Sequence, residues 1–326
     1  MGRYMLRRLA NYLILVIVAS SLAYFLAALS LNPRANFEQQ KPRPTTAQID
    51  ATLETYNLNP ETPVVVRYAR WVDGVAHGNL GLDIKGGSVS DDFARRVGVS
   101  VRLLVIATII GSLGGVLVGA YGAIKQYRLF DRFTTLASFL LLAMRVFVLA
   151  ISLEMFAVDI NQSAGTTVIQ YIGEYSPTVS GFWPVLFSRL QHLILPTIAL
   201  SLFQIAQYSR YQRNTMLDVL GSDFLRTARA KGLRRRTALM KHGLRTAILP
   251  IVPLLVYNIV LLFTGATFTE KIFGWHGMGE WLVDSITTND VNSVAAVSLF
   301  TAAVVLVAGL LSDLIYSALD PRVRFS

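Results

Sequence analysis

No charged residue occurs between Leu9 and Leu31. Such a stretch is long enough to cross a bilayer, which takes a helix of about 20 apolar residues, and only a helix or a closed barrel pairs its own backbone groups inside lipid. The stretch is also longer than the apolar core of about 7–15 residues found in a cleaved signal peptide. It therefore predicts a membrane anchor that stays in the protein.

Five more apolar stretches follow the first one. They run roughly over residues 99–124, 133–158, 192–211, 247–268 and 294–319. With 53% hydrophobic residues, 15% charged residues and a mean hydropathy of +0.48, the composition is typical of a polytopic membrane protein. We predict an all-α membrane protein with six transmembrane helices, so that both termini lie on one side of the membrane.

Basic residues are distributed unevenly among the connecting segments. Ten basic and two acidic side chains lie between Arg210 and Arg245, which accounts for most of the net charge of +10. Lysine and arginine in short loops favour the cytoplasmic side, so we expect this segment and both termini to be cytosolic. Residues 32–98 carry eight basic and eight acidic side chains, and residues 269–293 are net acidic, so both segments are expected to face outward. The orientation of the chain in the membrane then explains the net positive charge, and no nucleic-acid partner is expected.

These boundaries divide the chain into four parts. Residues 1–31 form a cytosolic N-terminus with the first transmembrane helix, and residues 32–98 form a small extracytoplasmic domain rich in proline and glycine. This segment is too long for a hairpin and too aromatic for a disordered linker. Residues 99–320 form a core of five transmembrane helices with a cytosolic loop at 212–246, and residues 321–326 form a cytosolic tail.

The cytosolic loop contains the most informative pattern of the chain. Residues 223–232 read Asp-Phe-Leu-Arg-Thr-Ala-Arg-Ala-Lys-Gly, and the sequence Ala-Ile-Leu-Pro follows at 247–250. Ser222 or Asp223 can cap a helix start, and Gly232 can take the left-handed conformation that ends a helix. The pattern predicts a short basic helix. A polybasic loop lying on anionic lipid would explain the charge, but not the ordered Ala, Gly and Pro positions.

This loop resembles the cytoplasmic signature loop of ABC importer permeases, in the form found in the dipeptide and oligopeptide family. The resemblance extends over nearly the whole chain. Arg7-Arg8-Leu9 resembles the start of the B-type subunit, and residues 78–81 (Gly-Asn-Leu-Gly) resemble a Gly-Asp-Leu-Gly turn of the family. Gly115 and Gly119 have an i, i+4 spacing that permits close helix packing. Arg-Thr-Ala at 226–228 stands where the general importer consensus has Glu-Ala-Ala, and this departure resembles the peptide subfamily. The segment Asn-Pro-Arg at 32–34 departs from the family itself, which usually has Pro-Gly-Asp-Pro there.

The resemblance implies a type I ABC importer-like permease subunit in the cytoplasmic (inner) membrane that takes up peptides. Its partners would be a homologous C-type permease, two ATPase subunits that bind ATP and magnesium, and an extracytoplasmic peptide-binding protein. Specificity would rest mainly with the binding protein. Oligopeptides are the favoured substrate and dipeptides the second choice, with nickel or glutathione as remote alternatives. The residues expected to contact an ATPase are Asp223, Arg226, Thr227, Ala228, Arg229, Ala230, Lys231 and Gly232. The family's loop between the last two spans is matched by Glu270, Phe273, Gly277, Gly279, Asp284 and Asp290.

The third apolar stretch contains two further candidate residues. Arg145 and Phe147 lie where the family usually reads Ser-x-Pro-x-Phe, so that an arginine replaces a proline. An arginine within a membrane helix is costly unless it faces a partner or a water-filled path, which makes the two residues candidates for the translocation path. Alternatively, Arg145 reaches the lipid interface or the helix boundaries differ from those expected. Glu154 lies nine positions further, which is the opposite face of a continuous helix, so the two charges are not expected to pair.

The sequence offers no pattern for chemistry within this chain. A Gly-x-x-x-x-Gly-Lys-Ser/Thr phosphate-binding loop is absent, and the four histidines have no His-Glu-x-x-His spacing. Cysteine is absent, which excludes thiolate chemistry. We therefore expect a subunit that is not an enzyme and binds no cofactor or metal. A self-contained ion-coupled transporter is the main alternative, but it would need ionisable groups converging at mid-membrane and usually an internal repeat.

Overall fold

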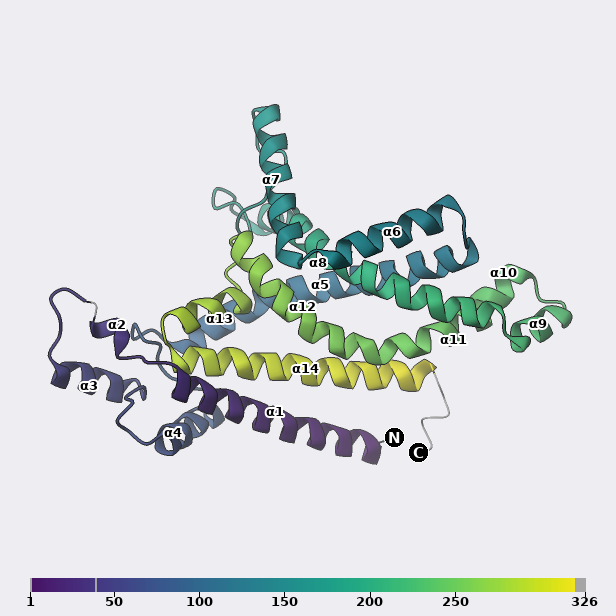
Figure 1. The fold of residues 1–326 in the computed structure, drawn as a ribbon. Coiled ribbons are helices and arrows are strands. Elements are labelled where there is room, and N and C mark those ends of the chain that lie inside the picture. Colours follow the sequence, from purple (N-terminus) through teal and green to yellow (C-terminus); the bar gives the residue numbers. More distant parts are fainter. Residues whose placement is uncertain (1, 39, 320–326) are drawn as a thin grey trace. The chain divides into compact units, whose positions relative to one another are not determined.

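The computed structural model describes residues 2–38 and 40–319, and helices dominate this part of the chain (Figure 1). It divides into two compact units. The first combines Met1–Val101 with Trp275–Val307, and the second combines Arg102–Gly274 with Ala308–Ser326. Two of the three divisions fall inside long helices, α5 (Val89–Ile124) and α14 (Val291–Leu319), and the third falls at residues 274–275, between two helices. The expected cytosolic tail at 321–326 lies outside the described residues.

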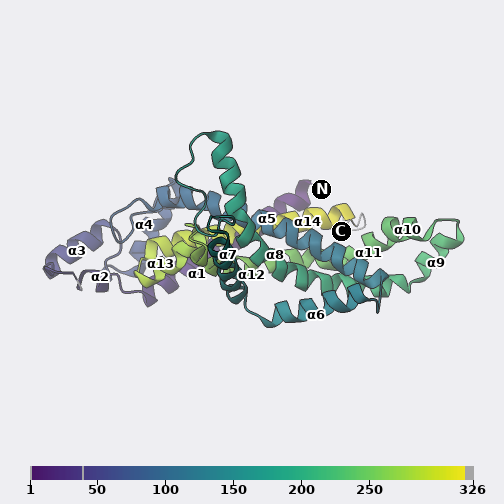
Figure 2. The ribbon, with the colours of Figure 1, turned by 90° about the horizontal axis from the view of Figure 1, so that it is seen from above.

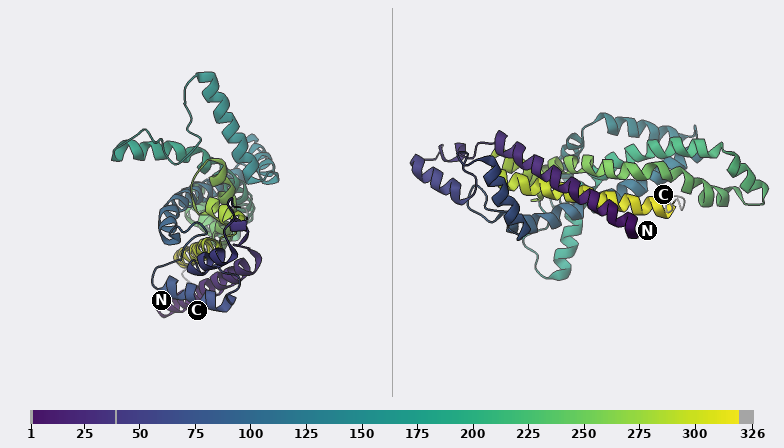
Figure 3. Two further views of the ribbon diagram at one scale, coloured as in Figure 1. Left: turned by 90° about the vertical axis from the view of Figure 1, so that its left-hand side faces the viewer. Right: turned by 90° about the horizontal axis from the view of Figure 1, so that it is seen from below.

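The first unit has its core where the end of α1 meets the segment that follows it. Besides parts of α5 and α14, its helices are α1 (Gly2–Ser30), α2 (Ala35–Glu38), α3 (Thr46–Thr55), α4 (Val64–Ala76) and α13 (Met278–Thr287). Tyr24 of α1 and Trp71 of α4 are buried with their ring centroids 5.1 Å apart, and Leu53 of α3 and Ala295 of α14 pack into the same cluster. The right-hand view of Figure 3 shows the end of α1 beside the start of α14. The described residues between α1 and α5 thus fold onto a shared apolar core.

Local polar contacts fix the ends of helices in this unit. The side chain of Thr45 accepts a hydrogen bond from the backbone N–H of Gln48, and the Gln48 side chain accepts one from the backbone N–H of Thr45, which is the capping box that starts α3. Gly81 has φ +95°, which favours glycine, in the glycine-containing segment next to the isolated β-bridge between Leu82 and Ser88. These contacts give the segment after α1 a defined structure.

The second unit is organised around one long helix, α8. The other helices are α6 (Leu129–Ala143), α7 (Val146–Ala164), α9 (Asp223–Ala230), α10 (Arg235–Ala238), α11 (Leu244–Ile248) and α12 (Val252–Ile272), with a π-helical turn at Leu239–Gly243 and a 3₁₀ turn at Leu249–Ile251. α8 (Phe182–Leu220) contacts α6, α7, α11 and α12. Its 39 residues span about 58 Å, well beyond a hydrocarbon core of about 30 Å. Figure 2 shows α9 and α10 beyond the C-terminal end of α8.

Glycines bring α5 into close contact with α8, as their spacing predicts. A Cβ atom added at Gly115 would lie 2.5 Å from Cβ of Tyr208, and one added at Gly119 would lie 2.4 Å from the carbonyl oxygen of Ser209. Both distances are shorter than any contact that a methyl group tolerates. The i, i+4 glycine pair therefore permits close helix packing, and the prediction for Gly115 and Gly119 is confirmed.

The long helices of the structure agree only partly with the six expected spans. Among the described residues, five helices are long and apolar enough to cross a membrane: Arg8–Glu38, Val89–Ile124, Val146–Ala164, Phe182–Leu220 and Val291–Tyr316. The expected fifth stretch, 247–268, lies on α11, the 3₁₀ turn and α12, where the description of side chains is incomplete. The count of six spans and the outward position of residues 32–98 stay predictions.

The expected continuous helix over 133–158 is wrong. α6 ends at Ala143 and α7 begins at Val146, and the backbone between them is extended at Met144 (φ −90°, ψ 146°) and Arg145 (φ −76°, ψ 144°). An apolar run favours burial in lipid, but it does not by itself decide whether the helix continues. The break places the charge of Arg145 at a helix start, where the side chain is exposed, and not within a helix.

Candidate coupling site

The short helix α9 is formed by the residues that were predicted to form it. Ser222 has the extended backbone of an N-cap (φ −74°, ψ 147°), but its hydroxyl donates to the carbonyl of Val219 at 2.6 Å and does not cap α9. At the other end Gly232 has φ +90°, and its N–H donates to the carbonyl of Arg229 at 3.0 Å. The left-handed glycine stop is confirmed, while the side-chain cap by Ser222 is wrong because that hydroxyl binds the end of α8.

α9 separates an apolar face from a charged one. Leu225 is 4% exposed and packs against Met216 and Val219 of α8 and Leu239 of the π-helical turn. Ala228 is half-buried beside the same cluster. The exposed positions are Asp223, Phe224, Arg226, Thr227, Arg229, Ala230, Lys231 and Gly232. One leucine thus fixes α9 to the end of α8 and leaves the basic face open.

A hollow of about 250 Å³ lies at the base of α9. Leu220, Leu225 and Leu239 line it together with the side chains of Arg226 and Arg229. The Arg226 guanidinium lies 3.3 Å from Asp223, but both side chains are largely exposed, so the pair contributes little to stability. The hollow thus combines leucine side chains with two cations, a lining that suits a partner with an apolar side chain next to acidic groups.

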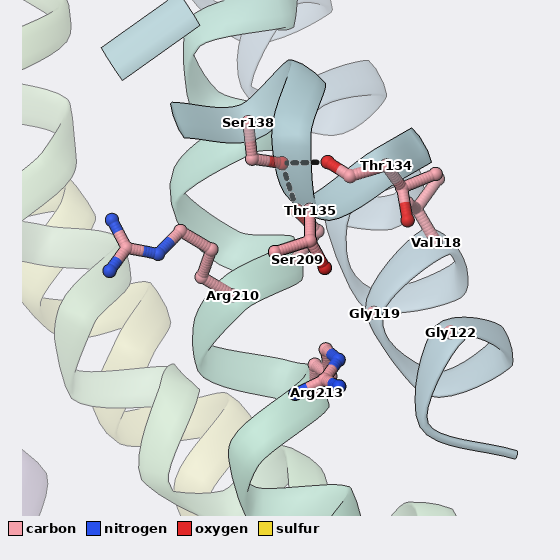
Figure 4. A pocket seen from close by; sticks show the side chains of 9 residues that line it. All are labelled: Val118, Gly119, Gly122, Thr134, Thr135, Ser138, Ser209, Arg210 and Arg213. Carbon is pink, nitrogen blue, oxygen red and sulfur yellow. Dashed lines mark hydrogen bonds between the residues drawn. The ribbon is translucent and has the colours of Figure 1, made fainter. Parts of the chain in front are cut away.

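Figure 4 shows where α5, α6 and α8 meet, with Ser138 of α6 beside Ser209 and Arg213 of α8. Close to this place, Arg213 forms an ion pair with Asp131 of α6, which Figure 4 does not draw. Asp131 at the start of α6 is 2% exposed, and its two carboxylate oxygens accept hydrogen bonds from Arg213 of α8 at 2.5 and 2.9 Å. The same carboxylate accepts the backbone N–H of Tyr127, a residue with φ +63°. Ser138 of α6 and Ser209 of α8 form a further hydrogen bond at 3.2 Å. α6 is therefore fixed to α8 at two levels along its length.

This ion pair was not anticipated from the sequence. Asp131 and Arg213 are 82 residues apart, and Arg213 was counted only among the basic residues of the cytosolic loop. In the structure residues 212–220 continue α8, so Arg213 belongs to a helix and not to an irregular loop. The position of Asp131 at a helix start is ordinary for an acidic residue and gave no signal of a partner.

The two translocation-path candidates lie next to each other at the start of α7. Arg145 is the N-cap residue of α7 and is exposed, and the ring of Phe147 lies 6.0 Å from that of Phe268 on α12. Glu154 is half-buried further along α7. A role of Arg145 and Phe147 in translocation stays a prediction, now for a break between two helices.

The residues of the expected outer loop are divided between the two units. Glu270 and Phe273 belong to the second unit and are 1% and 0% exposed. Gly277, Gly279, Asp284 and Asp290 belong to the first unit, in and around α13.

Asp290 has the best-defined partners of this set. Its carboxylate accepts hydrogen bonds from the Ser293 hydroxyl at 2.6 Å, the Ser293 N–H at 3.2 Å and the Ile84 N–H at 3.3 Å. Burial raises the pKa of this carboxyl, although the hydrogen bonds from Ser293 and Ile84 oppose the rise. Asp290 therefore ties the start of α14 to the segment that precedes α5.

Within the described residues, no group of three or more His, Asp or Glu side chains is placed to hold a metal ion. His192, for example, is buried on α8 and its Nδ1 lies 2.7 Å from the carbonyl of Ser188, a contact within one helix turn. The polar groups described above either pair with one another or are exposed at the surface of the chain, which suits a structural and docking role.

Comparison with known proteins agrees with the resemblance seen in the sequence. Residues 111–325 match the family model described as binding-protein-dependent transport system inner membrane component. The chain is 53% identical over 327 residues to the oligopeptide transport system permease protein OppB of Mycobacterium tuberculosis, with 100% of both chains covered. It is 32% identical to the oligopeptide permease AppB of Bacillus subtilis over 87% of each chain, and 31% identical to the dipeptide permease DppB of Escherichia coli over 82% of this chain and 83% of that one. The chain therefore belongs to the family of binding-protein-dependent transport system inner membrane components, as a multi-pass integral membrane permease.

Proposed function

We propose that this chain is the permease subunit of an ATP-driven peptide importer, that it forms half of the translocation path, and that oligopeptides are its favoured cargo. The named relatives that support the substrate are oligopeptide and dipeptide permeases. The other half of the path is a homologous C-type permease, and an extracytoplasmic binding protein delivers the peptide. Both termini and α9 lie in the cytosol, in keeping with the distribution of Lys and Arg.

The observation that carries the proposal is the amphipathic construction of α9. Its basic face docks on an ATPase subunit, and that subunit holds ATP and magnesium. Because Leu225 packs between α8 and the π-helical turn, a movement of α9 is transmitted to α8. α8 in turn is bound to α6 through Asp131 and Arg213. ATP binding in the partners thus shifts the population of the permease between inward-open and outward-open states.

Charge reversal on α9 tests this coupling. We expect the double variant Arg226→Glu with Arg229→Glu to lose uptake at least tenfold and to lose peptide-stimulated ATP hydrolysis in proteoliposomes that hold the complete transporter. Both side chains are exposed, so the variant should keep the thermal stability of the wild type. Arg128→Glu is the matched control, because Arg128 is an exposed arginine in the connection between α5 and α6.

Three results would contradict the proposal. Unchanged uptake and ATPase co-purification in the double variant would remove the coupling role of α9. Equal losses in the Arg128 control would show a general response to charge. Uptake by this chain without any ATPase would favour an ion-coupled transporter instead. Competition between a dipeptide and a pentapeptide in the same vesicles decides between the two peptide classes.

A further inference from the structure

A second and larger hollow lies on the opposite side of α8 from its glycine contacts with α5. It measures about 510 Å³ and is lined by Leu142 of α6 and by Phe203, Gln207, Arg210, Tyr211 and Asn214 of α8. Ligand sites in proteins usually measure about 300–1,000 Å³. The hollow is thus large enough for a small peptide segment.

The polar residues of this hollow form a stripe on one face of α8. Gln207, Arg210 and Asn214 are three and four positions apart, which places them on neighbouring turns of the same face. The opposite face carries Tyr208 and Gln212, which are both fully buried against the glycines of α5. One face of α8 therefore builds the core, while the other presents amides, a phenol and a guanidinium to an open space.

Arg210 differs from the neighbouring Arg213 in its electrostatic environment. Arg213 is paired with the buried carboxylate of Asp131. The guanidinium of Arg210 lies 4.4 Å over the ring of Phe139 on α6, and no carboxylate in the described part of the chain pairs with it. Figure 4 shows the Arg210 side chain extending away from Gly119 and Gly122 of α5. A ring contact of this kind positions a cation and leaves its N–H groups available for an anion.

We infer that Arg210 binds the terminal carboxylate of a peptide as it passes through the permease, while Gln207, Tyr211 and Asn214 hydrogen-bond its main chain. Amide side chains both donate and accept hydrogen bonds, as peptide groups do, so these contacts are independent of the peptide's side chains. A guanidinium is the best partner for a carboxylate, which every unmodified peptide carries. The inference rests on the proposed peptide transport and adds the chemical group that this chain itself recognises.

The test compares two peptides in proteoliposomes of the complete transporter, tetra-alanine with a free carboxylate and tetra-alanine amide. We expect Arg210→Gln to lower the ratio of free-acid to amide uptake about tenfold, the factor that corresponds to about 1.4 kcal/mol. Arg210→Lys keeps the charge and should lose less. Arg189→Gln is the matched control, because Arg189 is also on α8 and lies over an aromatic ring, that of Tyr175 at 5.2 Å, but is outside the hollow.

Several outcomes would overturn the inference. In Arg210→Gln, an unchanged ratio of free-acid to amide uptake, or an equal loss of uptake of both peptides, would show that Arg210 stabilises the fold or binds an anionic lipid headgroup. If the wild type accepts only the free acid, equal loss in Arg210→Gln and Arg210→Lys would overturn the inference in the same way. By contrast, a wild type that takes up neither peptide with ATP contradicts the proposed function itself.

Discussion

The close contact between α5 and α8 predicts that alanine has opposite effects at different glycines of one helix. A Cβ at Gly119 would lie 2.4 Å from the Ser209 carbonyl oxygen and 2.8 Å from Cβ of Gln212, and neither atom is the mobile end of a side chain. The backbones must therefore separate. Overpacking of this kind costs about 1–3 kcal/mol, and the rigid neighbours favour the upper end. The gain in helix propensity from Gly to Ala offsets about 1 kcal/mol, so we expect Gly119→Ala to lower the unfolding free energy by about 2 kcal/mol.

Two other glycines of α5 serve as controls for this substitution. Gly98 has no atom within 4 Å of an added Cβ, so Gly98→Ala should gain the helix propensity alone, about 1 kcal/mol. At Gly122 the nearest atom, Oδ1 of Asp131, is 3.4 Å away, which is an ordinary contact, so Gly122→Ala should lie between the other two. The predicted order of stability is Gly98→Ala, Gly122→Ala, wild type and Gly119→Ala.

Thermal denaturation of the detergent-purified protein, followed by circular dichroism, measures this order. A loss of about 2 kcal/mol corresponds to a fall in Tm of about 4–8 °C for a unit of 150–250 residues. If Gly119→Ala is as stable as Gly98→Ala, the two helices do not approach as closely as the structure shows, and the argument from glycine spacing is refuted.

Three further predictions concern the ion pair between Asp131 and Arg213, the core of the first unit and the buried carboxyl of Asp290. Asp131→Asn leaves Arg213 without its charge partner and should lower the unfolding free energy by about 3 kcal/mol. The double variant Asp131→Asn with Arg213→Gln should lose less stability than the sum of the losses in the two single variants, which a double-mutant cycle of Tm values measures. Trp71→Ala should cost about 3–5 kcal/mol and expose residues 32–88 to limited proteolysis, whereas Trp71→Phe should keep most of the protection. Because burial raises the pKa of Asp290, the folded state binds more protons than the unfolded state between about pH 3.9 and the raised pKa. Stability should fall as pH rises through that window, and Asp290→Asn should flatten the decline of Tm with pH; parallel curves would contradict this.

Several features could be predicted because they depend on residues close together in the sequence. Gly232 was expected to end a helix, and it does so with φ +90°. The i, i+4 spacing of Gly115 and Gly119 predicted a close helix contact, although not that the partner would be α8. Apolar runs of about 20 residues predicted membrane helices without any knowledge of their neighbours.

Other features depended on residues that are distant in the sequence. The side-chain cap by Ser222 was wrong because its hydroxyl bonds to the end of the preceding helix. The pairing of Asp131 with Arg213 arises only when α6 packs against α8, since neither residue has a distinctive local pattern.

By itself the sequence determined the all-helical membrane character, the short basic helix and the glycines that permit close packing, because hydrophobicity and backbone preference are local properties. Only the tertiary structure decided where the third apolar stretch breaks, at Met144 and Arg145, and which arginine of α8 is neutralised. Arg210 and Arg213 are equivalent in the sequence, but Coulomb interactions depend on distance in space, and only Arg213 lies beside a buried carboxylate.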